Sequence, residues 1–316
     1  MSCGSDSSSG PVDPSAHVVD LPGAAGVIDF DDIVYSRALD RVLVPARESG
    51  LYLVDPRNGT ARRAGRLGSA DSADEGGRML FVLDREARTI TVLDERGQVA
   101  TSVKLDVPAD YVRFVPSRRE LWVTEPAASP SGIEIFALGS GAAPAPRRSG
   151  FIAVPNGPEA LALATRRRTA YTHAGADLLA IDIDRRTIDG RWPTGCPGTH
   201  GFPRVDARER RVLASCASNG EVALIDPASG RAVAREAAGG DEALPGYSPT
   251  TDHFYVRGDP GTKLVTLQRS KAGFRRVRTV NVPQDGHCLT ADESGHYWTC
   301  DARAGRILQF EDRAAR

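Results

Sequence analysis

The chain has 316 residues, and its 40 basic and 41 acidic side chains leave a formal net charge of −1. This balance provides no basic surface for nucleic acid, so we expect no nucleic-acid partner. No apolar stretch is close to the length of about 18 residues that a transmembrane helix needs. We therefore expect contact with a membrane only through a lipid anchor.

The N-terminal segment, residues 1–16, is small and polar, which predicts a flexible Ser/Gly-rich tether. Cys3 is followed by Gly and Ser, a pattern similar to the acylated N-terminus of a mature bacterial lipoprotein, and we interpret Cys3 as a lipidation site. This interpretation requires that an apolar signal segment upstream has been trimmed from the sequence. The alternative is an ordinary cytosolic start with a chance cysteine.

From residue 17 onward, one unit repeats: a short strand rich in Val, Ile and Leu, followed in its clear copies by a turn that begins with Asp. In such a turn the Asp carboxylate accepts backbone N–H bonds, and a residue such as Gly230 takes the positive φ that closes it. Clear copies end at Asp55, Asp94, Asp182 and Asp226, and weaker copies end at Phe136, Gln268 and Phe310.

The ends of these copies recur about every 39 to 45 residues, with about four strands per unit, which is typical of β-propeller blades. They predict an all-β fold, a single seven-bladed β-propeller over residues 17–316 with four-stranded antiparallel blades. The last repeat, from about Gln284, holds only three strands. We expect the N-terminal strand Ala16–Asp20 to supply the fourth and close the ring, which removes two open sheet edges.

The middle strand of several repeats carries a second pattern, as in Leu121–Glu125 (Leu-Trp-Val-Thr-Glu) and Tyr297–Cys300 (Tyr-Trp-Thr-Cys). It resembles the Leu-Tyr-Val-Thr-Asn segment of the bacterial YVTN-type, surface-layer-like propeller family. The resemblance covers nearly the whole chain after residue 25 and implies the fold. It does not fix the function, because this architecture hosts binding proteins, scaffolds and enzymes.

Four further cysteines favour an exported protein. Cys288 and Cys300 flank the hairpin turn Asp292–Gly295, and pairing the strands about that turn brings them within one residue of juxtaposition. Cys216 ends the equivalent strand two blades earlier, and Cys196 lies in the loop before its partner strand. The simplest pairing is Cys196–Cys216 and Cys288–Cys300. The alternative is buried free thiols.

In a propeller, the innermost strand of every blade starts at one face of the ring, and the second strand ends there. We call this face the mouth. Acidic and imidazole side chains should therefore gather at the mouth, although each of them alone would be an ordinary turn or surface group. The acidic and histidine residues at the inner-strand starts and second-strand ends are Asp31, Asp32, Asp71, Asp84, Asp110, Glu125, Glu159, His173, His200, Asp241, Glu242, Asp285 and His287.

Carboxylates around one pore repel each other unless protons or a cation relieve them. Imidazole beside carboxylate suits zinc or another divalent transition metal. We predict a metal site formed by His200 and His287, assisted by His173, Glu159 or Asp285, with Asp32, Asp110 and Glu125 lining the mouth. Binding should weaken below about pH 6, where protons compete for imidazole. The arginines are scattered and mostly in turns, so we expect them to be solvated.

A second resemblance concerns Cys196-Pro-Gly-Thr-His-Gly201. It is similar to the Cys-x-Gly-x-His-Gly element of periplasmic zinc-chaperone propellers, which deliver zinc to the binding protein of an ABC transporter. The resemblance implies Cys196 as half of a disulfide and His200 as a ligand. Those proteins often have a His-rich N-terminus, whereas this chain has a Ser-rich one.

One hypothesis is an extracytoplasmic, lipid-anchored propeller that binds or delivers a divalent metal to a metal-transport binding protein or another cell-envelope protein. The alternative is a protein-interaction scaffold with no metal. A propeller lactonase or lyase is a third hypothesis, which we favour least. No Ser-His-Asp spacing or Gly-rich phosphate loop stands out, and Asn, a typical ligand of calcium-dependent propeller lactonases, is scarce.

Overall fold

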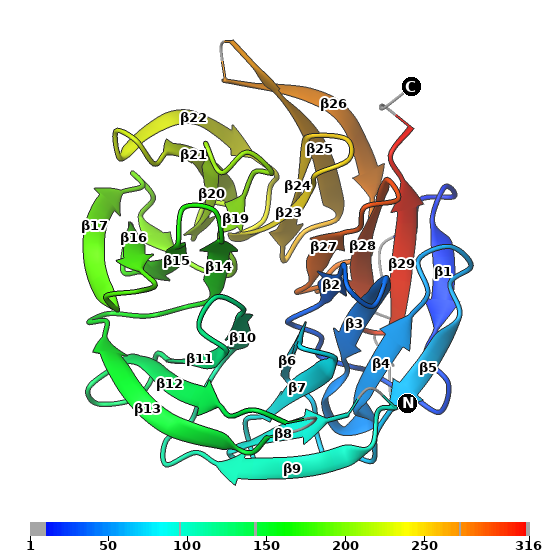
Figure 1. Cartoon of the computed structure of the whole chain (residues 1–316). Coiled ribbons are helices and arrows are strands. Elements are labelled where there is room, and N and C mark those ends of the chain that lie inside the picture. The colour runs from blue at the N-terminus through cyan, green and yellow to red at the C-terminus, as the bar shows by residue number, and fades with distance from the viewer. Residues whose placement is uncertain (1–10, 95, 142–143, 272, 314–316) are drawn as a thin grey trace, which may run out of the picture.

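The computed structural model describes residues 11–313, except for residues 95, 142–143 and 272. Over this range the chain forms seven antiparallel sheets arranged as the blades of a ring (Figure 1). Strands dominate, and the one described helix is a single 3₁₀ turn at Arg47–Ser49. The predicted all-β, seven-bladed propeller is therefore confirmed.

The first four blades each contain four strands in sequence order from the centre outward. Blade one consists of β2 (Val34–Ser36), β3 (Arg41–Pro45), β4 (Leu51–Val54) and β5 (Ala61–Ala64). Blade two consists of β6 (Ser72–Gly76), β7 (Met79–Asp84), β8 (Thr89–Leu93) and β9 (Val99–Lys104). Blade three consists of β10 (Val112–Val115), β11 (Glu120–Glu125), β12 (Gly132–Leu138) and β13 (Pro146–Ala153). Blade four consists of β14 (Leu161–Ala164), β15 (Thr169–Ala174), β16 (Asp177–Asp182) and β17 (Thr187–Pro193).

The last three blades complete the ring. In blade five the inner strand is split in two, and its strands are β18 (Gly198–Thr199), β19 (Arg204–Val205), β20 (Val212–Ala217), β21 (Glu221–Asp226) and β22 (Arg231–Ala237). Blade six consists of β23 (Glu242–Ser248), β24 (His253–Asp259), β25 (Lys263–Ser270) and β26 (Gly273–Asn281). Blade seven consists of β27 (Leu289–Ala291), β28 (His296–Asp301), β29 (Arg306–Glu311) and the N-terminal strand β1 (His17–Asp20).

The Asp turns set the ends of the hairpins as the repeat predicts. Asp226 accepts the backbone N–H of Ala228 through Oδ1 at 3.1 Å, and its main-chain oxygen accepts the N–H of Gly230 at 2.8 Å. Gly230 has φ 68°, a conformation that favours glycine. Asp94 Oδ1 likewise accepts the N–H of Gln98 at 2.8 Å. These bonds fix the register of the third and fourth strands.

The ring closes through β1, which lies antiparallel to β29 as the outer strand of blade seven (Figure 1). Val19 is opposite Ile307 in this register, and both side chains are buried against blade one. The predicted closure by the N-terminal strand is confirmed. It joins the two ends of the described chain in one sheet.

The hydrophobic core is divided among the blade interfaces. In the described part of the chain, seven buried clusters each join two neighbouring blades, and an eighth lies at the centre of the ring. Between blades six and seven, for example, the ring of Tyr297 stacks on those of Tyr255 and Phe310, with centroids 4.5 and 5.2 Å away. A blade therefore buries its faces only by stacking on its neighbours, which holds the inner-strand ends in fixed positions.

Candidate metal site at the channel mouth

Three potential metal ligands from three blades converge at the mouth. His200 lies between β18 and β19, Glu242 starts β23, and His287 lies just before β27. One ligand atom from each of the three residues lies within 4.8 Å of the others. His200 Nε2 is 3.2 Å from Glu242 Oε2, and the two imidazole rings meet edge to face with centroids 5.3 Å apart. The structure thus brings His200 and His287 together, as the strand geometry predicts.

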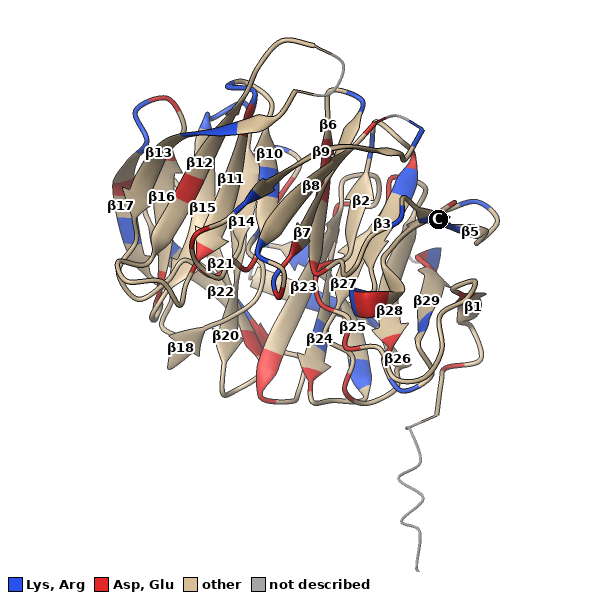
Figure 2. Ribbon diagram, turned by 90° about the horizontal axis from the view of Figure 1, so that it is seen from below, with Lys and Arg blue, Asp and Glu red and all other residues tan. Residues whose placement is uncertain are grey.

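Two further carboxylates lie against the Nδ1 atoms of these histidines. Glu159 Oε1 is 3.6 Å from His200 Nδ1, and Asp259 Oδ2 is 2.7 Å from His287 Nδ1. From the sequence, Glu242 was expected at the mouth but not among the ligands, and Asp259 was not predicted at all. Asp259 ends β24, a second strand, so the rule that selected Glu125 and His173 could have found it. Glu242 and Asp259 are opposite each other across β23 and β24, and both strand ends carry acidic residues (Figure 2).

The carboxylates keep both histidines more basic than usual. Contact with Glu159 raises the pKa of His200 to about 8, because this effect and the charges of Glu159, Glu242 and Asp31 outweigh partial burial. Burial alone would lower the pKa of His287, but the hydrogen bond to Asp259 and the nearby acidic charges raise it. The acidic surroundings therefore favour the protonated form of both histidines.

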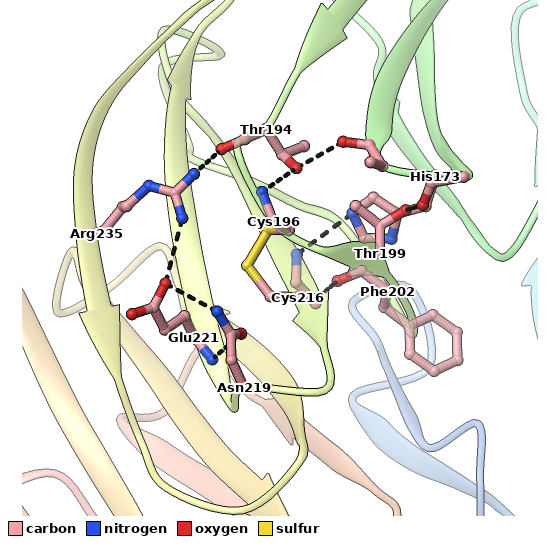
Figure 3. The surroundings of a disulfide bond; sticks show 12 residues. His173, Thr194, Cys196, Thr199, Phe202, Cys216, Asn219, Glu221 and Arg235 are labelled. Carbon is pink, nitrogen blue, oxygen red and sulfur yellow. Dashed lines mark hydrogen bonds and ion pairs between the residues drawn. A yellow bond between two sulfur atoms is a disulfide. The ribbon is translucent and has the colours of Figure 1, made fainter.

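His173 does not join this group. Its ring is fully buried, Nδ1 is 3.0 Å from the main-chain oxygen of Gly201, and Nε2 accepts the backbone N–H of Ser215 at 3.3 Å. Burial lowers the pKa of His173 to about 4, so the ring stays neutral. Figure 3 shows it beside the Cys196–Cys216 loop. The prediction of His173 as a metal ligand is corrected, because both of its ring nitrogens already bind the backbone.

Asp285 also lies apart from the histidines. Its Oδ2 is 2.7 Å from Arg303 Nη2, and it lines a separate surface cavity of about 560 Å³ with Val27 and Asp29. Asp285 has φ 60°, so the turn before β27 rotates it away from His287 two residues later. Glu242 and Asp259, and not Asp285, are the carboxylates that lie beside His287.

The three predicted mouth residues have different surroundings. Asp110 lies at the mouth, with Oδ1 2.6 Å from Arg85. Asp32 is fully buried within the channel. Glu125 is also buried and has Glu134, Arg148 and Asp106 as its charged neighbours, so it faces the outer strands of blade three and not the channel. Burial and the adjacent Glu134 carboxylate raise the pKa of Glu125 to about 8.

Side chains from blades one, three and five cross the channel beneath the mouth. Asp32 accepts two hydrogen bonds from the Arg113 guanidinium at 2.6 and 2.7 Å. Arg113 and Arg204 lie over the ring of Phe202, 5.4 and 4.9 Å from its centroid, and Tyr111 contacts the ring edge-on. Blades one, three and five are not neighbours, so these contacts can form only across the centre. They constrict the channel beneath the histidines.

The structure brings both expected cysteine pairs to disulfide distance. Cys196 and Cys216 have Cα atoms 5.2 Å apart, and Cys288 and Cys300 have Cα atoms 5.9 Å apart. The first bridge anchors the loop that carries His200, and the second joins the strands behind His287. Cys3 lies outside the described residues.

Comparison with known proteins identifies the fold. No family model and no curated protein matches the sequence. Similar solved structures include a chain titled "Crystal Structure of Mitotic Checkpoint Complex", with a TM-score of 0.75, 12% identity and 93% of each chain covered. "Structure of U3-55K" has a TM-score of 0.75, 12% identity, and covers 95% of this chain and 99% of the other. "Kuenenia stuttgartiensis Hydrazine Synthase" has a TM-score of 0.74, 12% identity, and covers 92% and 99%.

The fold is therefore that of a seven-bladed β-propeller. At 12% identity these similarities show the fold alone. Among the described residues, we find no helix of the length and apolarity that crossing a membrane requires.

Proposed function

We propose that this chain is an extracytoplasmic propeller that binds a divalent transition metal, with zinc as the expected ion, at the channel mouth. The ligands are His200, His287 and Glu242. The observation that carries the proposal is the convergence of their ligand atoms within 4.8 Å, from three separate blades. A set of two histidines and one glutamate is a common three-residue zinc site.

The position of the site fits reversible binding. Three protein ligands leave a fourth coordination position, as in zinc sites that bind water or a substrate. The side chains of His200, His287 and Glu242 remain 20–33% exposed. A partner could therefore supply a ligand and receive the metal, which agrees with the resemblance of Cys196–Gly201 to zinc-chaperone propellers. A metal-transport binding protein is the partner that this chemistry suits.

The proposed location follows from the cysteines. Two cysteine pairs at disulfide distance support folding in an oxidising compartment, such as the periplasm or the cell surface. Lipidation of Cys3 would attach the propeller to a membrane without a transmembrane helix.

A zinc titration of the purified, metal-free protein tests the proposal. We expect one saturable site in the wild type and its loss in the His200→Ala, His287→Ala double variant. A matched control, His17→Ala with His296→Ala, removes two histidines away from the mouth and should bind zinc as the wild type does. Equal binding by both double variants, or no saturable binding by the wild type, would refute the proposed site.

The second candidate function is a protein-interaction scaffold. The observation in its favour is the similarity to propellers in solved assemblies, one of them titled as a mitotic checkpoint complex. In that case the mouth would attract cations only loosely, and added salt would abolish the effect. A zinc titration in about 0.5 M salt separates the two functions, because a coordinated metal ion is retained while loose attraction is screened.

A further inference from the structure

Asp259 holds one of the two proposed metal-binding histidines in a defined orientation. Its Oδ2 lies 2.7 Å from His287 Nδ1, within hydrogen-bond distance. It is not part of the group of ligand atoms that converge within 4.8 Å. The two side chains are only 20% and 16% exposed, so water competes weakly for this bond.

The strand register explains why Asp259 is in this position. Asp259 ends β24 directly opposite Glu242 at the start of β23. Side chains at opposite positions of an antiparallel pair extend from the same face of the sheet. Glu242 and Asp259 therefore approach His287 together: Glu242 Oε2 is 3.8 Å from Nδ1, and Asp259 makes the closer contact.

The chemistry of this contact determines which nitrogen can bind a metal. An ionised carboxylate only accepts hydrogen bonds, so a neutral His287 donates its proton to Asp259 from Nδ1. Nε2 then carries the free lone pair. A metal-binding imidazole generally donates its other N–H to a carboxylate or carbonyl, which fixes the tautomer and increases the basicity of the ligand nitrogen.

We propose that Asp259 is a positioning residue that keeps the Nδ1 proton on His287 and thereby leaves Nε2 as the nitrogen free to bind the metal. This inference rests on the proposed function. His200 differs, because its Nδ1 is 3.6 Å from Glu159, beyond a normal hydrogen bond. The two carboxylates are therefore unequal, and Asp259 is the one that fixes the geometry of the site.

The test compares Asp259→Asn with two other variants. Asp285→Asn is the matched control, because it makes the same substitution in the loop of His287 at a residue that pairs with Arg303. Glu159→Gln removes the more distant carboxylate. At a pH above the raised pKa of His200, where few protons compete with zinc, we expect Asp259→Asn to weaken zinc binding about 10- to 100-fold, Glu159→Gln to weaken it less, and Asp285→Asn to leave it unchanged.

A spectroscopic measurement separates positioning from loss of structure. ¹⁵N NMR of metal-free protein, at a pH where His287 is neutral, should show the Nδ1–H tautomer in the wild type and a mixture in Asp259→Asn. The Nε2–H tautomer in the wild type would overturn the inference, whether or not zinc binds. An equal zinc affinity of wild type and Asp259→Asn would also overturn it. Absence of saturable zinc binding by the wild type refutes the proposed function instead, while the tautomer still tests the hydrogen bond.

Discussion

Zinc binding to this propeller should depend steeply on pH between pH 8 and pH 6. The pKa of His200 is raised to about 8, so its ring is largely protonated at pH 7. Zinc binds only the neutral ring, and binding must release the proton. The loss of affinity expected from the sequence lies below about pH 6, the range of an unperturbed histidine. The carboxylates at the mouth move it upward.

The size of the effect follows from the fraction of neutral imidazole. With a pKa of about 8, this fraction falls about fivefold from pH 8 to pH 7 and about ninefold from pH 7 to pH 6, and the apparent affinity falls with it. An unperturbed histidine with a pKa of about 6.5 would change the affinity only about 1.3-fold between pH 8 and pH 7. The interval from pH 8 to pH 7 therefore distinguishes the two cases. His287, whose pKa is also raised, adds to the slope.

Competition titrations with a zinc chelator, at several pH values and constant ionic strength, measure this slope. The chelator must be corrected for its own protonation. We expect Glu159→Gln to flatten the slope between pH 8 and pH 7, because it removes the carboxylate that contributes most to the raised pKa of His200. An affinity that is constant between pH 8 and pH 7 in the wild type would refute the reasoning.

Three further predictions concern stability. Deleting residues 1–24 removes β1 and leaves blade seven with three strands, so the melting temperature should fall; an unchanged value would contradict closure by β1. Replacing Cys288 and Cys300 with serine should cost about 2–4 kcal/mol of unfolding free energy in urea titrations, and four free thiols in peptide maps of protein made in an oxidising compartment would contradict both bridges. The pKa of His173 falls from 6.5 unfolded to about 4 folded, so the unfolded state binds the extra proton. The free energy of unfolding should therefore be unaffected by the titration of His173 above pH 6.5. It should fall by about 3 kcal/mol as the pH falls from 6.5 to about 4, because the unfolded chain takes up the proton first. His173→Gln should remove this dependence.

The fold could be predicted from the sequence because a propeller repeats its local signals. A strand followed by an Asp turn, as at Val222–Asp226, fixes one hairpin, and its recurrence fixes the number of blades. The closing strand could be predicted because the last repeat contains only three strands and needs a fourth from elsewhere in the chain. The cysteine pairs followed from hairpin register, as for Cys288 and Cys300. All these inferences use residues close in sequence or related by the period of the repeat.

The details of the site were less predictable because they depend on where each side chain points. The sequence placed both His200 and His173 at the mouth, but the main-chain groups of Gly201 and Ser215 that engage His173 become visible only in the fold. Asp285 was chosen because it lies, like His287, at the start of the inner strand of blade seven. Asp259, 28 residues away, is the actual neighbour because blades six and seven are adjacent.

The two sides of the mouth differ in the cationic side chains that face the carboxylates. On the side of blades one to three, arginines pair with the carboxylates: Arg85 binds Asp31 and Asp110 at 2.7 and 2.6 Å, and Arg47 binds Asp71. The prediction that arginines are only solvated surface groups is wrong for these two, and also for Arg113, which is buried in the channel.

On the side of blades five to seven, histidines take the place of arginine opposite Glu242 and Asp259. The difference matters because arginine does not lose its proton in proteins and has no lone pair for a metal, whereas histidine exchanges a proton for a metal near neutral pH. The carboxylates beside Arg47 and Arg85 thus always face a positive charge. The histidines beside Glu242 and Asp259 can instead lose a proton. Replacing His200 with arginine should therefore preserve the charge balance and the fold while abolishing zinc binding, which a role in charge balance alone would not predict.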